Sequence, residues 1–171
     1  MKHTTKQLCL TALLCAFTAV VSKLSIPIPG LSAPLTLQIF AVSLCGYLLG
    51  PIRGIICIFL YILLGICGVP VFSGFGTGFG ALLGPTGGFI LSFPLLAFIC
   101  GISSRINKKS KILLDISGLI ICHLCGIFYY MYIGGCAFGV AATAVSLPYI
   151  VKDFLLLLGA QLTVKKIKKV L

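Results

Sequence analysis

The central part of the chain reads Gly68-Val-Pro-Val-Phe-Ser-Gly-Phe-Gly-Thr-Gly-Phe-Gly-Ala-Leu-Leu-Gly-Pro-Thr-Gly-Gly-Phe-Ile-Leu-Ser-Phe-Pro94, with long apolar segments on both sides. Every second residue from Gly74 to Gly80 is a glycine. Each glycine inside a helix costs about 1 kcal/mol relative to alanine, so a regular helix is not expected through these positions. Glycine does allow the backbone to fold tightly against another group, and we therefore predict a loop here.

The composition predicts an all-α integral membrane protein. Only 9% of the 171 residues are charged and 60% are hydrophobic, whereas soluble domains carry about 25% charged residues. A membrane-spanning helix needs about 20 residues, so the chain has room for five to seven spans and no separate soluble domain. We expect residues 1–171 to form a single transmembrane substrate-binding domain.

Six spans fit the apolar segments. Pro27 and Pro29 end the first apolar segment. We interpret this segment as a retained membrane span and not as a cleaved signal peptide. Six spans place both termini on one side, and every basic residue except Lys23 and Lys152 then falls on that side. The positive-inside rule makes this side cytoplasmic and the glycine-rich loop external. The net charge of +11 is therefore a topology signal, with no nucleic-acid partner implied. The predicted spans are 8–21, 34–49, 52–67, 81–103, 112–138 and 143–164.

The sequence favours a protein that is not an enzyme. It contains no nucleophile–base pair, no His-Glu-x-x-His and no Gly-x4-Gly-Lys-Ser/Thr motif, so it predicts no catalytic residue and no ATP hydrolysis by this chain. Nine cysteines lie scattered, mostly in apolar runs, which predicts free thiols. Cys122 and Cys125 have the spacing of half a zinc site that no second pair completes, so neither a metal nor a cofactor is predicted.

A few polar side chains stand out because ionisable groups are costly inside a membrane. Only two acids occur. Asp115 is expected to pair with Lys111 at the inner interface, and Asp153 is the stronger candidate for function. Gln38 could bond either another helix or a ligand, while His123 is expected to join helices. Gln38, Thr86 and Asp153 can all approach an outward-facing pocket beneath the glycine-rich loop, which could close over a ligand.

Five parts of the chain carry a family resemblance: Ser25-Ile-Pro-Ile-Pro-Gly30, Pro34-Leu-Thr-Leu-Gln38, Tyr61, Gly68-Val-Pro-Val-Phe72 and Gly84-Pro-Thr-Gly-Gly-Phe89. They resemble the BioY family, the biotin-binding S components of energy-coupling-factor (ECF) transporters, and the similarity spans essentially the whole chain. The resemblance implies the six-helix S-component fold in a bacterial cell membrane and capture of biotin from outside. It also implies partnership with a T component and two ATP-binding-cassette ATPase subunits. Small residues four apart share a helix face, and the resemblance makes Ala12 and Ala16 the docking face for the T component.

The last helix departs from the family pattern Pro-Phe-x-x-Gly-Asp-x-x-Lys, because it reads Pro148-Tyr-Ile-Val-Lys-Asp-Phe-Leu-Leu156. Adjacent helical residues point about 100° apart, so we expect that Lys152 does not simply replace a lysine at position 156. Three interpretations follow. Lys152 reaches the pocket from another direction, backbone amides meet the ligand carboxylate, or the ligand or its affinity differs.

The sequence thus predicts biotin uptake by a membrane-embedded binding subunit. The ureido ring is expected to bond Asp153 and polar groups near Gln38 or Thr86, with phenylalanines packing on the bicyclic body. Alternatives are an S component for another vitamin-like solute, a structural membrane subunit that transports nothing, and a transporter that works without the ATPase module. The predicted substrate-binding residues are Gln38, Phe72, Phe75, Phe79, Gly80, Thr86, Gly87, Tyr149, Lys152 and Asp153.

Overall fold

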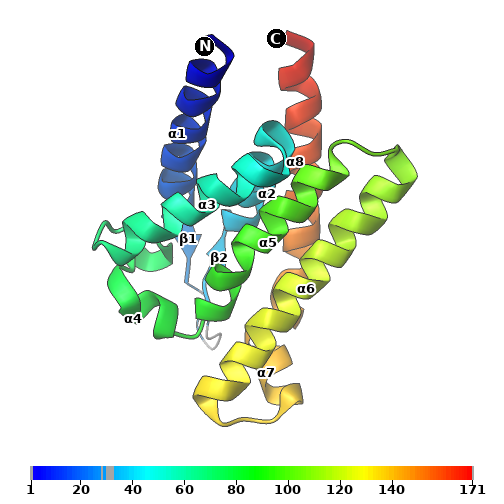
Figure 1. Ribbon diagram of the computed structural model, residues 1–171. Helices are drawn as coiled ribbons and strands as arrows, with labels where there is room; N and C mark the ends of the chain where they lie inside the picture. The colour runs from blue at the N-terminus through cyan, green and yellow to red at the C-terminus, as the bar shows by residue number, and fades with distance from the viewer. Residues whose placement is uncertain (1, 28, 30–32, 171) are drawn as a thin grey trace.

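The computed structural model describes residues 2–27, 29 and 33–170, and helices dominate these ranges (Figure 1). Two strands of two residues each, which the sequence did not reveal, form a hairpin between the first two helices: β1 (Ser25–Ile26) runs antiparallel to β2 (Leu35–Thr36), with Ser25 opposite Thr36. Ile28 and Gly30 of the first matching motif lie outside the described residues. The helices are α1 (Lys2–Ser22), α2 (Gln38–Leu49), α3 (Pro51–Ile66), α4 (Gly78–Leu83), α5 (Gly87–Ser103), α6 (Lys108–Gly134), α7 (Phe138–Val145) and α8 (Leu147–Val170), and the strands are β1 (Ser25–Ile26) and β2 (Leu35–Thr36).

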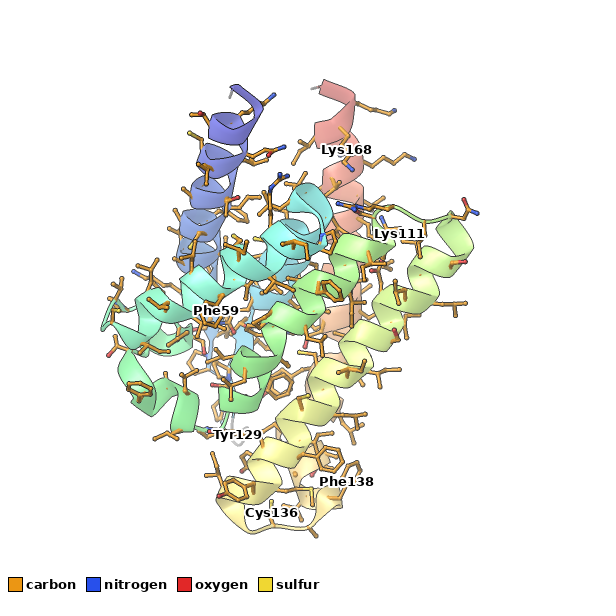
Figure 2. The ribbon with its side chains drawn as sticks, in the orientation of Figure 1. Phe59, Lys111, Tyr129, Cys136, Phe138 and Lys168 are labelled. Atoms are coloured by element: carbon orange, nitrogen blue, oxygen red, sulfur yellow. The ribbon has the colours of Figure 1, made fainter. Side chains whose placement is uncertain are left out.

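The lengths of the helices and their exposed apolar side chains are those of a membrane protein. Within the described residues, α1, α6 and α8 are long and apolar enough to cross a bilayer, while α2, α3 and α5 are shorter apolar helices. Large apolar side chains such as Leu13, Phe59 and Leu113 are more than half exposed, and Figure 2 shows Phe59 on the outside of the bundle. Both chain ends lie at the same end of the molecule (Figure 1).

The predicted span 81–103 is in fact two helices. The six-residue helix α4 ends at Leu83, Gly84 is extended (φ −80°, ψ 178°), and α5 begins only at Gly87. A residue before proline is pushed away from the helical region, and Pro85 has no N–H to donate. The Gly84-Pro-Thr-Gly-Gly block therefore separates a short surface helix from the buried helix α5.

The last two predicted spans also have different limits. Helix α6 ends at Gly134, because Gly135 takes a left-handed conformation (φ 58°) and its N–H bonds the carbonyl of Met131. The end of the fifth predicted span, the predicted loop at 139–142 and the start of the sixth span form the separate helix α7. Helix α8 then starts at Leu147, with Pro148 in its first turn, where the missing N–H costs no helical hydrogen bond.

Helix α5 lies at the centre and packs against α2, α3 and α6. Glycine makes the closest of these contacts possible: a Cβ on Gly46 of α2 would lie 2.3 Å from the carbonyl oxygen of Ala97 on α5. The buried residues of α2, α3 and α5 form one apolar core that includes Tyr47 and Tyr61. This rigid centre holds the first turns of α2 and α5 in place, and these turns form part of the site described next.

As predicted, the glycine-rich stretch does not form one continuous helix. A 3-10 turn at Ser73–Phe75 precedes α4, although α4 includes Gly78 and Gly80, two of the glycines that we had placed in the loop. Gly74 (φ 65°) and Gly78 (φ 66°) have positive φ, which other residues rarely adopt. The Gly74 N–H donates to Ser25 Oγ (3.2 Å), which ties the loop to β1.

Asp115 does not form the predicted surface pair with Lys111. Its carboxylate is fully buried and accepts hydrogen bonds from Ser103 Oγ (2.5 Å) and Gln161 Nε2 (2.6 Å). Lys111 Nζ instead lies 4.6 Å from the centre of the Tyr47 ring. Asp115 therefore joins α5, α6 and α8 within the bundle.

Candidate functional site: a small charged cavity

A small cavity lies where α2, α5 and α8 begin, away from the two chain ends (Figure 1). Its volume of about 40 Å³ gives room for about three water molecules. Five of the ten predicted substrate-binding residues line it: Gln38, Thr86, Tyr149, Lys152 and Asp153. The other lining residues are Ala33, Pro34, Thr36, Ile39, Ser73, Phe89, Phe93 and Val145.

An ion pair forms the charged part of the cavity wall. Lys152 Nζ lies 2.6 Å from Asp153 Oδ1 and donates a hydrogen bond to the Thr36 carbonyl oxygen at 2.9 Å. Asp153 is only 4% exposed. Because removing a charge from water is costly, the buried carboxylate of Asp153 and its partly buried partner Lys152 in a cavity wall are candidates for function.

Asp153 retains an unused acceptor in this cavity. The contact of Oδ1 with Lys152 lacks the angles of a hydrogen bond, and no described residue bonds this atom. Buried polar atoms in proteins nearly always have a partner. Oδ1 has almost no exposed surface, so a donor other than Lys152 can reach it only after the cavity widens.

His123 supports the carboxylate from behind. Its Nε2 lies 3.4 Å from Asp153 Oδ2, and its Nδ1 lies 2.9 Å from Ser146 Oγ. The imidazole is 2% exposed and meets the Phe89 ring edge-on. The sequence had suggested only that His123 joins helices. It does so, and the helix that it contacts carries the acid of the cavity.

Lys152 reaches the cavity, as the first of the three interpretations expected. Positions 152 and 156 are four residues apart and therefore lie on one face of α8. The contacts of Lys152 with Asp153 and Thr36 place its ammonium group in the cavity wall one turn before Leu156. Of the three interpretations, the geometry favours the one in which Lys152 enters the pocket.

Gln38 combines the two roles that the sequence left open. Its Nε2 donates to the Tyr61 hydroxyl at 3.1 Å, and that hydroxyl donates to the Val71 carbonyl oxygen at 3.1 Å. Thr36 Oγ1 lies 3.4 Å from Gln38 Oε1. The side chain is thus bonded to α3 and also lines the cavity.

The aromatic wall differs from the predicted one. Phe72 is buried against Tyr61, edge-on at 5.6 Å, and Phe79 is 65% exposed, so neither lines the cavity. The side chain of Phe75 lies outside the described part of the structure. Phe89 and Phe93 take their place. They are four residues apart on α5, but Phe75 and Phe79 have the same spacing, so the sequence offered no signal that distinguishes the two pairs.

Gly80 and Gly87 were also predicted but do not line the cavity, whereas Tyr149 lines it and also holds a neighbouring segment in place. Gly80 has open space beside its Cα, and Gly87 packs so closely that a Cβ would lie 1.7 Å from the Leu82 carbonyl oxygen. The Tyr149 hydroxyl donates to the Ala33 carbonyl oxygen, which joins α8 to the segment before β2. Gly87 and Tyr149 thus determine how α4 and the hairpin approach the site.

Ala12 and Ala16 lie on one exposed face of α1. The opposite face is buried and carries Thr18, whose hydroxyl lies 3.3 Å from Cys45 Sγ on α2. The two alanines are therefore free of contacts that would prevent another helix from packing on them.

No three His, Cys, Asp or Glu side chains gather as a metal site within the described ranges.

Fold and site together define a helical membrane protein with a small, charged cavity enclosed between helix ends and a glycine-rich loop. The chain belongs to the BioY family, whose sequence model matches residues 1–171. A protein of Pyrococcus horikoshii named "Probable biotin transporter BioY" is 40% identical over 148 residues, which cover 86% of this chain and 87% of the relative. The "Biotin transporter BioY" of Thermotoga maritima is 32% identical over 167 residues, 96% of each chain.

A solved structure confirms the predicted fold. The crystal structure of the S-component for biotin from an ECF-type ABC transporter matches this chain with a TM-score of 0.89, covering 98% of this chain and 93% of the other. The two sequences are 24% identical. The chain therefore has the S-component fold, with α1, α2, α3, α5, α6 and α8 as its six main helices.

Proposed function

We propose that this chain binds biotin in the small cavity and delivers it across a bacterial cell membrane. Relatives that match most of the chain are named biotin transporters, and the protein of like fold is an S-component for biotin. The observation that carries the proposal is the Lys152–Asp153 pair in the cavity wall, because it offers a charged donor beside a charged acceptor.

The pair suits the ureido ring of biotin. A cyclic urea presents a carbonyl oxygen next to N–H groups, so one face needs a donor and an acceptor side by side. Lys152 supplies ammonium donors and Asp153 Oδ1 supplies the unused acceptor. Hydrogen bonds to charged groups are the stronger kind, worth about 1.5–3 kcal/mol each. With both charges at the ureido end, other donors meet the carboxylate at the far end of biotin.

The glycine-rich loop acts as a lid in this proposal. A cavity of about 40 Å³ has to widen before biotin can enter. Ser73 and Thr86 of the loop line the cavity, and the Gly74–Ser25 hydrogen bond is exposed. Breaking that bond and rotating about Gly74 and Gly78 opens the pocket at low cost. Closing the loop then surrounds the ligand and excludes water.

The chain spans the membrane six times, with both termini in the cytoplasm. The six main helices and the position of both chain ends at one end of the bundle support this topology (Figure 1). Reporter fusions test it. Alkaline phosphatase is expected to be inactive after residue 171 and active in the 135–137 turn, and the reverse pattern would contradict the orientation.

Transport needs an energy source outside this sequence, which has no Gly-x4-Gly-Lys-Ser/Thr motif. We propose that a T component docks on Ala12 and Ala16 and that two ATP-binding-cassette subunits hydrolyse ATP. Uptake of biotin is expected only in cells that also express these partners. Uptake in cells that lack them would identify a transporter that works alone.

Equilibrium binding of radiolabelled biotin to the purified chain in detergent tests the substrate. We expect saturable binding that unlabelled biotin displaces and that riboflavin and thiamine do not displace. The absence of saturable binding, together with binding of another vitamin, would assign the protein to a different solute. Binding of no vitamin would favour a structural subunit.

A further inference from the structure

A second hollow lies between the start of α6 and the end of α8. Its volume is about 500 Å³, so it is much larger than the cavity at Asp153. Figure 2 shows two of its lining residues, Lys111 and Lys168, at the end of the molecule where both termini lie. The hollow is lined by Ser104, Lys111, Ile112, Gln161, Leu162, Val164, Lys165, Lys168 and Lys169.

The charges of this hollow are all positive. Its four lysines have no ion pair with a carboxylate of the described residues. The charge of Asp115 acts on Lys111, but the Asp115 carboxylate is fully buried and bonded to Ser103 and Gln161. Lys165, Lys168 and Lys169 thus gather without an ion pair to a described acid, and an anion would stabilise them.

Besides the lysines, Ser104 and Gln161, the wall contains three apolar side chains, and these favour an anion that also has an apolar part. Ile112 and Leu162 are 43% and 63% exposed, and each is close in sequence to a lysine of the hollow. Both belong to helices long and apolar enough to cross a membrane. A soluble anion gains nothing from such a wall. A lipid gains from both parts, since its phosphate meets the lysines while its acyl chain follows the helices.

We propose that this hollow binds the headgroup of an anionic phospholipid. One phosphate lies among Lys111, Lys165, Lys168 and Lys169, and the acyl chains run along Ile112 and Leu162. Because the hollow joins the first turn of α6 to the last turns of α8, a bound lipid fixes these two helix ends relative to each other.

Spin-labelled lipids give the test. The full chain is reconstituted in phosphatidylcholine bilayers with a trace of labelled phosphatidylglycerol or labelled phosphatidylcholine, and the motionally restricted fraction is measured. We expect a preference for phosphatidylglycerol that falls roughly five-fold for each lysine removed, as in Lys165→Gln/Lys168→Gln. The preference is also expected to weaken in 1 M salt.

Lys6→Gln/Lys166→Gln is the matched control, because it removes two charges that do not line the hollow. This control is expected to keep the preference, and an equal loss in both variants would replace the site with a diffuse surface charge. Displacement of the labelled lipid by millimolar inorganic phosphate would show a site for free anions and overturn the proposal. The proposal would also be overturned if the protein showed no preference for phosphatidylglycerol and instead bound a polyglutamate peptide at these lysines.

Discussion

The cavity at the start of α8 and the hollow at its end differ in how their charges are balanced. The cavity at the start of α8 contains one lysine and one aspartate 2.6 Å apart, with His123 behind them. The hollow at the end of α8 is lined by four lysines and no acid. A balanced pair can bind a neutral group that both donates and accepts hydrogen bonds, whereas unbalanced lysines attract an anion. The same helix thus carries the two proposed recognition sites at its two ends.

Among the variants of the cavity, Asp153→Asn is expected to lower biotin affinity the most. The amide keeps the shape but removes the acceptor charge and leaves Lys152 without its partner. Losing a hydrogen bond to a charged group predicts a fall in biotin affinity on the order of 100-fold. Equilibrium binding measures it.

Asp115→Asn is the matched control, because it makes the same change in the other buried acid, outside the cavity. We expect lower thermal stability with nearly unchanged affinity. Equal loss of affinity in both variants, in parallel with lost stability, would give Asp153 a structural role.

Lys152→Gln is expected to lower affinity by about ten-fold, because a charged donor to the ureido oxygen becomes a neutral one. Biotin and biotinamide, in which the carboxylate is an amide, should lose affinity equally. This comparison separates the two ends of the ligand. A loss seen with biotin alone would show that Lys152 meets the carboxylate instead.

His123→Phe is expected to cost several-fold in affinity, because it removes the polar group 3.4 Å from Asp153 Oδ2. His123→Gln restores a side-chain N–H and should recover most of the loss. Since both variants keep a side chain in the buried space, equal affinities in the two, with equal stability, would mean that His123 only fills space.

The smallest effects are expected on the apolar wall. Phe89→Leu should lower affinity a few-fold, since Phe89 lines the cavity, while Phe79→Leu should change it less than two-fold, since Phe79 is 65% exposed and lies elsewhere. Competition binding measures both. Greater loss in the Phe79 variant would mean that the lid carries this ring onto the ligand.

Apolar run length and the proline and glycine positions predicted the six main helices, because these features act locally along the chain. The division at Gly84-Pro85 was missed because the residues on both sides are apolar, and length alone joined them into one span. The β1–β2 hairpin was missed because two-residue strands leave no periodic pattern.

The site was predictable where a polar residue stands out in an apolar run, as Gln38, Thr86 and Asp153 do, and all three line the cavity. Aromatic residues carry no such contrast, so Phe72 and Phe79 could not be distinguished from Phe89 and Phe93 without the packing. The contact of His123 with Asp153 joins residues thirty positions apart on α6 and α8, and no local pattern reveals it.

A structure of the chain with biotin bound tests the central claim most directly. We expect the ureido ring between α2, α5 and α8, with an N–H donating to Asp153 Oδ1 and the carbonyl oxygen accepting from Lys152 Nζ. A ligand bound elsewhere, or with its carboxylate on Lys152 and no contact with Asp153, would contradict it.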